Sequence, residues 1–245
     1  LRFLLPLATA LYAQTAFTGA GRLPERPLVA LTQAMQQHGV GFSAEKLPFT
    51  TQGRLQAPLG FPAAPRLAPQ PAMTHFLTLT LNPALDIATR TEQVQATHKL
   101  RCAGVQRYPG GGGINVARVL HRLGAPVQAW ALAGGPAGAQ LQQLLAREGV
   151  PTLVHPISGD TRENLSVLET CTGREFRFVL PGPTVGPADW QAGLELLRTP
   201  PPITLPAAPQ WVIASGSLPP GVPDDFYAQA ARLAKAQGRH VVLDT

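Results

Sequence analysis

Four side chains in this sequence belong to types that bind sugars and phosphates. A carboxylate stands at Asp86, an amide at Asn115, a guanidinium at Arg162 and a hydroxyl at Ser217. A carboxylate accepts hydrogen bonds from sugar hydroxyls, an amide both donates and accepts them, and a guanidinium binds phosphate in a forked geometry. Together they suit a ligand that carries hydroxyl and phosphate groups.

Taken singly, each of these side chains also has a plainer explanation. Asp86 in NPALD could be a solvated loop aspartate five residues beyond a strand, and Arg162 in DTREN a surface charge. The turn SGSLPPG could be an ordinary strand-to-helix connection that exposes Ser217. KLRC places Lys99 and Arg101 on one face of a polar strand, which is also typical of a solvated face.

The run PGGGGINVAR, 109–118, places four consecutive glycines directly before a predicted helix. Glycine costs backbone entropy, so something must approach the main chain closely: a phosphate, a sugar or another piece of backbone. The spacing fits neither G-x-x-x-x-G-K-[ST] nor G-x-G-x-x-G, which excludes the common nucleotide loops. Free N–H groups at the helix start suit a polar ligand, and Asn115 suits a sugar hydroxyl. A tight loop with Asn115 as a local cap is the alternative.

Charge and cysteine usage narrow the class of protein. The formal net charge is +6, but residues 1–72 carry six Lys and Arg against two Asp and Glu, while residues 73–245 carry fourteen against twelve. No basic run interleaves with aromatic residues, which argues against nucleic-acid binding. Cys102 and Cys171 lie far apart and in no metal-ligand spacing, which indicates reduced thiols. We expect a soluble cytoplasmic protein with no membrane partner.

The first 72 residues differ from the rest of the chain. They are rich in Pro, Gly, Gln and Ala, with recurring breakers, and are predicted to be mostly disordered. LRFLLPLATALYA also resembles the apolar part of a signal peptide, although a proline interrupts it and no disulfide framework follows. At Met73 the sequence changes to MTHFLTLTLNPALD. We expect the folded unit, and the natural start of translation, at Met73.

Strands and helices alternate from Met73 onward, which predicts an α/β fold with a mostly parallel sheet covered by helices on both faces. Two polar segments, about 86–108 and 164–180, interrupt this alternation and predict a small extra sheet that acts as a lid or an oligomer contact. The second segment is expected to be a hairpin turning at 171–173. The predicted strands are 75–81, 127–133, 152–157, 210–215 and 240–244, and the predicted helices 114–123, 137–149, about 187–198 and about 223–237.

The order of several motifs carries more information than any one of them. Residues 73–245 contain, in succession, LTLNPALD, KLRC, PGGGGINVAR, TRENLSV, FRFVLPG, SGSLPPGV and VVLDT. In this order they resemble the ribokinase-like carbohydrate kinases of the PfkB family. KLRC and FRFVLPG narrow the resemblance toward phosphosugar kinases of the minor 6-phosphofructokinase type.

This resemblance implies a three-layer α/β/α sandwich with a small β lid, often shared in a homodimer. It implies transfer of the ATP γ-phosphate to a sugar hydroxyl with Mg²⁺. By this resemblance, Asp86 would bind sugar hydroxyls, and Gly111, Gly112 and Asn115 would line the sugar pocket. Arg162 would bind the substrate, and Ser217 would complete the site. Arg101, of the same or a neighbouring subunit, would contact the sugar phosphate, and Lys99 would contact the nucleotide.

One part of the family pattern is missing. The family's catalytic aspartate lies in a late Gly-Ala-Gly-Asp segment, and this sequence ends at VVLDT before any such segment. Phosphoryl transfer depends on positioning and charge stabilisation, so the chain by itself is expected to be inactive. The leading hypothesis is the N-terminal, sugar-binding part of an ATP-dependent sugar-phosphate kinase. Fructose 6-phosphate is the first choice, fructose 1-phosphate and tagatose 6-phosphate are runners-up, and a non-catalytic sugar-phosphate-binding or dimerisation module is the alternative.

Overall fold

The chain folds as two compact units. The computed structural model describes residues 9, 13–18, 28–53, 74–199 and 207–244. The units are Leu1–Pro71 and Ala72–Thr245, so the division lies one residue before the boundary expected from the sequence. All the residues with expected roles belong to the second unit.

The first unit contains regular structure where we expected disorder. Strands β1 (Gln14–Phe17), β3 (Phe49–Gln52) and β2 (Gly41–Phe42) pair antiparallel in that order, and helix α2 spans Val29–Gln37. The Phe49 ring lies 5.7 Å from that of Phe17 and 5.4 Å from that of Phe42. The prediction of disorder is wrong for these elements, because the proline-rich breakers lie outside them, at 23–27 and 57–72. Met73 and most of the signal-like segment 1–13 lie outside the described residues.

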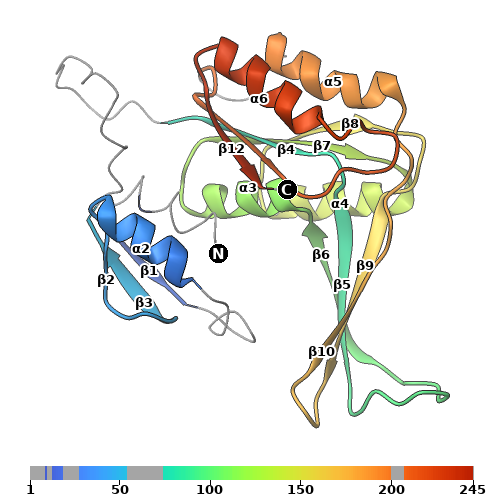
Figure 1. Cartoon of the computed structure of the whole chain (residues 1–245). Helices are drawn as coiled ribbons and strands as arrows, with labels where there is room; N and C mark the ends of the chain where they lie inside the picture. The colour runs from blue at the N-terminus through green and yellow to red at the C-terminus, as the bar shows by residue number, and fades with distance from the viewer. Residues whose placement is uncertain (1–8, 10–12, 19–27, 54–73, 200–206, 245) are drawn as a thin grey trace. The chain divides into compact units, whose positions relative to one another are not determined.

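The second unit is built on a five-stranded sheet in which every neighbouring pair is parallel (Figure 1). Strands β4 (Phe76–Thr80) and β7 (Val127–Ala133) are buried at every residue, as expected for a sheet covered on both faces. Because all the strands run the same way, their carboxyl ends meet at one edge. In sheet order the strands are β12 (His240–Asp244), β11 (Trp211–Ser215), β4 (Phe76–Thr80), β7 (Val127–Ala133) and β8 (Thr152–Pro156).

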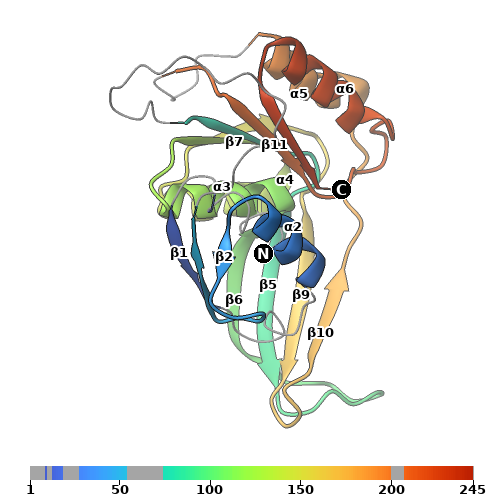
Figure 2. The same ribbon diagram turned by 60° about the vertical axis from the view of Figure 1, so that its left-hand side comes forward.

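Two pairs of helices cover the two faces of this sheet (Figures 1 and 2). Helices α5 and α6 pack against each other and bury Leu197 and Phe226 against Leu79 and Leu132 of the sheet. On the other face, α3 packs against β4 and β7. The three-layer sandwich predicted from the sequence is confirmed. The helices are α3 (Gly112–Arg122), α4 (Gly135–Arg147), α5 (Pro187–Arg198) and α6 (Phe226–Ala236).

A separate four-stranded sheet, the lid, extends away from the main sheet (Figure 1). Its existence and its hairpin are confirmed, but two local predictions are wrong. Asp86 lies inside β5 and not in a loop, because the chain turns at 81–83 and enters a new strand. KLRC is not a strand, since residues 92–102 contain none. The lid strands, in order, are β10 (Glu175–Val179), β9 (Arg162–Glu169), β5 (Ala84–Thr91) and β6 (Ala103–Gly110).

Candidate functional site

The carboxyl ends of β4 and β11 are joined by a side-chain hydrogen bond. Asn82 Nδ2 donates to Ser217 Oγ at 3.1 Å, and Gly216, with φ +112°, turns the chain just before Ser217. The Tyr227 hydroxyl donates to the Gly216 carbonyl at 2.7 Å. Burial, together with the nearby Asp244 carboxylate, raises the pKa of Tyr227 to about 12, so this donor keeps its proton. Ser217 is therefore fixed in position while it remains exposed.

The glycine run lies directly against these strand ends. A Cβ on Gly112 would lie 2.8 Å from the carbonyl oxygen of Ser215. A Cβ on Gly113 would lie 2.5 Å from the carbonyl oxygen of Leu79, and Gly111 has φ +117°, which other residues rarely adopt. The atoms that exclude side chains here belong to the protein. The lack of side chains therefore lets the start of α3 pack onto the ends of β4 and β11. Contact of Gly111 and Gly112 with a sugar stays a proposal.

Asp86 is oriented by a residue that sequence analysis missed. Asn164 Nδ2 donates to Asp86 Oδ1 at 2.8 Å, and Asn164 Oδ1 accepts from the Leu180 N–H at 3.3 Å. Asp86 and Asn164 are register partners on β5 and β9. The carboxylate also lies against Gly110, where a Cβ would come within 2.5 Å of Asp86 Cγ. The only sequence signal for Asn164 was its place in TREN, two residues after Arg162.

A pocket of about 190 Å³ opens on the face of the lid that carries Asp86. Its lining combines carboxylate, amide, hydroxyl and guanidinium groups, so it suits a small ligand with several hydroxyls and a negative charge. The residues with these groups are Asp86, Tyr108, Asn164, Ser166, Glu175 and Arg177.

Arg162 braces the backbone at the base of the lid. Its Nη2 donates to the Asn82 carbonyl at 3.0 Å, its Nη1 to the Leu180 carbonyl at 3.3 Å and its Nε to the Pro83 carbonyl at 3.4 Å. Burial lowers the pKa of Arg162 from its ordinary value, and the Asp86 carboxylate opposes this shift. Main-chain carbonyls therefore engage three of the five N–H donors of the guanidinium, and two remain for a ligand. Substrate binding by Arg162 stays a proposal.

Replacing Arg162 with glutamine is expected to lower the free energy of unfolding by about 2 kcal/mol, because three carbonyls lose a charged donor. Urea denaturation of the chain measures this. Arg174→Gln, at the exposed turn of the lid hairpin, is the control and is expected to change stability by less than about 0.5 kcal/mol. Full stability of Arg162→Gln with loss of ligand binding would show that Arg162 serves the ligand and not the fold.

Asn115 lies one turn into α3 with an exposed side chain. Its Oδ1 accepts from Arg118 Nη1 at 3.3 Å, and Arg118 also pairs with Glu148 at 2.6 Å. The helix begins with Gly111 at its N-cap and no side chain bonds there. The alternative role of Asn115 as a local cap is therefore wrong, and its amide nitrogen forms no hydrogen bond within the described residues.

Lys99 and Arg101 are not brought to Asp86 within one chain. The pairing of β5 with β6 runs from Ala84 opposite Gly110 to Arg90 opposite Ala103. Four residues of strand, about 13 Å, separate Asp86 from Arg90, and Arg101 lies beyond that end. Both cations are exposed. Contact with a ligand at Asp86 by either residue remains a proposal.

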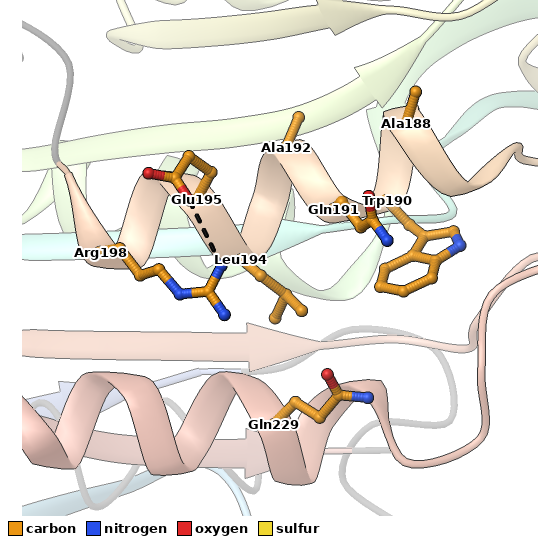
Figure 3. A pocket seen from close by; sticks show the side chains of 8 residues that line it. All are labelled: Ala188, Trp190, Gln191, Ala192, Leu194, Glu195, Arg198 and Gln229. Atoms are coloured by element: carbon orange, nitrogen blue, oxygen red, sulfur yellow. Dashed lines mark hydrogen bonds and ion pairs between the residues drawn. The ribbon is translucent and has the colours of Figure 1, made fainter.

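The larger pocket, about 560 Å³, lies between α5 and α6 (Figure 3). Trp190 and Leu194 line it, and the ion pair of Arg198 with Glu195, at 3.3 Å, lies along α5 (Figure 3). It shares no lining residue with the Asp86 pocket. Its place in the outer helical layer separates it from the strand ends.

The described residues include no group of three or more His, Cys, Asp and Glu side chains placed to hold a metal ion. Both cysteines are free and exposed. In the part of the chain that the structure covers, no helix has the length and apolar character needed to cross a bilayer. The polar groups of the lid pocket suit sugar hydroxyls and a phosphate.

The sandwich, its parallel strand ends and the attached lid define a ribokinase-like α/β protein. Over residues 79–245 the chain matches the pfkB family carbohydrate kinases, and it belongs to that family. This match covers the glycine run, the whole lid and the main sheet from the last two residues of β4 onward.

Named relatives agree with this assignment. The chain is 45% identical over 170 residues to ATP-dependent 6-phosphofructokinase isozyme 2 of Mycobacterium tuberculosis, covering 69% of this chain and 49% of the relative. It is 35% identical over 169 residues to 1-phosphofructokinase of Xanthomonas campestris, covering 69% and 52%. The crystal structure of Escherichia coli phosphofructokinase-2 with fructose-6-phosphate matches with TM-score 0.64 and 37% identity, covering 71% of this chain and 55% of that one. The chain spans about half the length of these relatives.

Proposed function

We propose that this chain binds a sugar phosphate at Asp86 and forms the sugar-binding part of an ATP-dependent sugar-phosphate kinase. The observation that carries the proposal is the Asp86 carboxylate, fixed by Asn164 and opening into a pocket that also holds a guanidinium. Fructose 6-phosphate is the preferred ligand, because the 45%-identical relative is a 6-phosphofructokinase and a 37%-identical one was crystallised with fructose-6-phosphate.

In this proposal the Asp86 carboxylate accepts hydrogen bonds from sugar hydroxyls. Its Oδ1 already accepts from Asn164, which fixes the direction of the remaining lone pairs. The exposed hydroxyl of Ser217 and the amide of Asn115 add hydroxyl contacts. Gly111 and Gly112 contribute backbone, since they have no side chain to offer.

ATP and Mg²⁺ belong to the proposed activity of a whole enzyme. They would supply the transferred phosphoryl group and stabilise its charge. The 245 residues contain no Gly-Ala-Gly-Asp sequence, so this chain offers no counterpart of the family's catalytic aspartate. We propose that it does not transfer phosphate by itself and that a whole enzyme acts in the cytoplasm.

A homodimer through the lid is part of the same proposal. The face of the lid opposite Asp86 carries the register partners Ile87, Leu165 and Phe178. Leu165 is 38% exposed and Phe178 52% exposed, which is unusual for apolar side chains in the middle of strands. A second lid covering this face would remove these side chains from water. Contact of Arg101 with the ligand of a neighbouring subunit is part of this proposal.

Three other functions are compatible with the same geometry. The similarity to a 1-phosphofructokinase favours fructose 1-phosphate as a second candidate, and tagatose 6-phosphate has the same chemical groups. A non-catalytic sugar-phosphate-binding module is the alternative from a different class. All three use the pocket at Asp86, and they differ from the preferred function in the position of the phosphate, in the configuration of one sugar hydroxyl, or in turnover.

The test uses the 245-residue chain with the three sugar phosphates. We expect calorimetric titration to show tightest binding for fructose 6-phosphate, and a coupled assay with ATP and Mg²⁺ to show no turnover. Absence of binding for all three ligands would refute the proposed site. Clear turnover would show that these residues suffice for catalysis, contrary to the proposal.

A further inference from the structure

Arg177 is an exposed cation in the pocket beside Asp86 that none of the expected roles uses. It lies on β10, at the far side of the lid from β6. Its guanidinium forms no ion pair and no hydrogen bond with any described residue. An unpaired arginine lining a pocket offers a complete forked donor set to an anion.

The strand register places Arg177 and Asp86 on the same face of the lid. Asp86 pairs with Asn164, which pairs with Val179, and this forms one row across the sheet. The next row on the same face joins Ala88, Ser166 and Arg177. Side chains of residues two apart on a strand point to the same face, so the two rows are neighbours.

The separation of the two residues suits one small ligand. Two strand spacings and two residues along a strand put their Cα atoms about 12 Å apart. A long arginine side chain and a short aspartate then bracket a gap of the size of a phosphosugar. The pocket between them has a volume of about 190 Å³. Hydroxyls at the carboxylate end and a phosphate at the guanidinium end match the charges of the two groups.

The other charged side chains near this face do not pair with the Arg177 guanidinium. Glu175 lies one row further from Asp86, and its carboxylate accepts a hydrogen bond from the Ser166 hydroxyl. Arg90 lies in that same outer row, paired with Leu168, and does not line the pocket. Arg162 donates to three main-chain carbonyls. Arg177 is therefore the cation that both lines the pocket and retains its donors.

We propose that Arg177 binds the phosphate group of the sugar phosphate and so sets the preference for phosphorylated over free sugars. This inference rests on the proposed function, since it assumes that the sugar lies at Asp86. It assigns to Arg177 the role that the sequence suggested for Arg162 within the same subunit.

The test compares fructose 6-phosphate with unphosphorylated fructose by calorimetric titration of the 245-residue chain. If another of the three sugar phosphates binds more tightly, that ligand and its free sugar replace this pair. The unmodified chain is expected to prefer the phosphorylated sugar at least tenfold. Arg177→Gln is expected to lose at least tenfold of this preference, while Arg177→Lys, which keeps the charge without the fork, retains part of it. Arg174→Gln, three residues away on the same hairpin, is the matched control and is expected to keep the full preference.

Each outcome decides between the two proposals. A full preference in Arg177→Gln would overturn the role of Arg177 and leave the proposed function standing. Binding by the unmodified chain without any preference for the phosphorylated sugar would also overturn it. Absence of binding by the unmodified chain to every phosphorylated ligand would overturn the proposed function and this inference together. Circular dichroism of each variant confirms that the lid and sandwich are folded.

Discussion

Replacing Asp86 with alanine is expected to weaken the binding of fructose 6-phosphate to this chain about a hundredfold. A carboxylate that accepts hydrogen bonds from sugar hydroxyls contributes about 1.5–3 kcal/mol for each bond, and a loss of about 2.7 kcal/mol corresponds to a factor of 100. The change also leaves Asn164 Nδ2 without its acceptor, so the amide loses the group that it orients. Calorimetric titration of the variant measures the loss directly.

Two controls separate the charge from the shape of Asp86. Asp86→Asn keeps an oxygen for Asn164 and nearly the same volume beside Gly110, and is expected to lose less affinity than the alanine variant. Asp224→Ala, an exposed aspartate outside the site, is expected to leave affinity unchanged. Affinity of Asp86→Ala within twofold of the unmodified chain would contradict the assignment of the sugar site.

Replacing Gly113 with alanine is expected to destabilise the second unit by about 3 kcal/mol. The added Cβ would lie 2.5 Å from both the Leu79 carbonyl oxygen and Thr80 Oγ1, in the buried contact between α3 and β4. Overpacking of this kind costs about 1–3 kcal/mol or more, because neither a backbone carbonyl nor a fully packed strand moves easily. The higher helix propensity of alanine recovers less than about 1 kcal/mol.

Urea denaturation of the variant tests this expectation. The control is Gly186→Ala, because Gly186 has φ −74° and a Cβ there would meet only Asp189 Oδ2, at 3.7 Å. We expect that control to stay within about 0.5 kcal/mol of the unmodified chain. Normal stability of Gly113→Ala combined with weakened sugar binding would favour the interpretation that the glycines make room for a ligand.

The sequence predicted most of the second unit because its elements follow strong local patterns. The strand Val127–Ala133 and the helix Pro187–Arg198 match their predicted bounds, since a continuous apolar run and a 3.6-residue period are each visible in one dimension. The start of α3 differs by two residues, because glycines carry no hydrophobic signal. The first unit was misjudged, because its short elements around Phe49 lie between long proline-rich stretches.

The candidate site could be predicted only as a set of residue types. Asp86 and Ser217 were recognised because each follows a predicted strand in a segment with turn residues. Asn164 and Arg177 were missed because their role depends on strand register. They follow Asp86 by 78 and 91 positions in the chain, and the register brings all three onto one face of the lid. Arg162 was recognised, but its bonds to the carbonyls of Asn82, Pro83 and Leu180 depend on where those loops lie.

By itself, the sequence determined the α/β class, the alternation of strands and helices, the presence of a lid and the resemblance to PfkB carbohydrate kinases. These properties follow from periodicity and from motif order, which are local. Only the tertiary structure decided why four glycines stand together and which arginine is free to bind an anion. Both answers depend on how segments that are far apart in the sequence pack together, and on where that packing leaves a pocket. The glycine run packs against the ends of β4 and β11. The pocket lies on the lid, between Asp86 and Arg177.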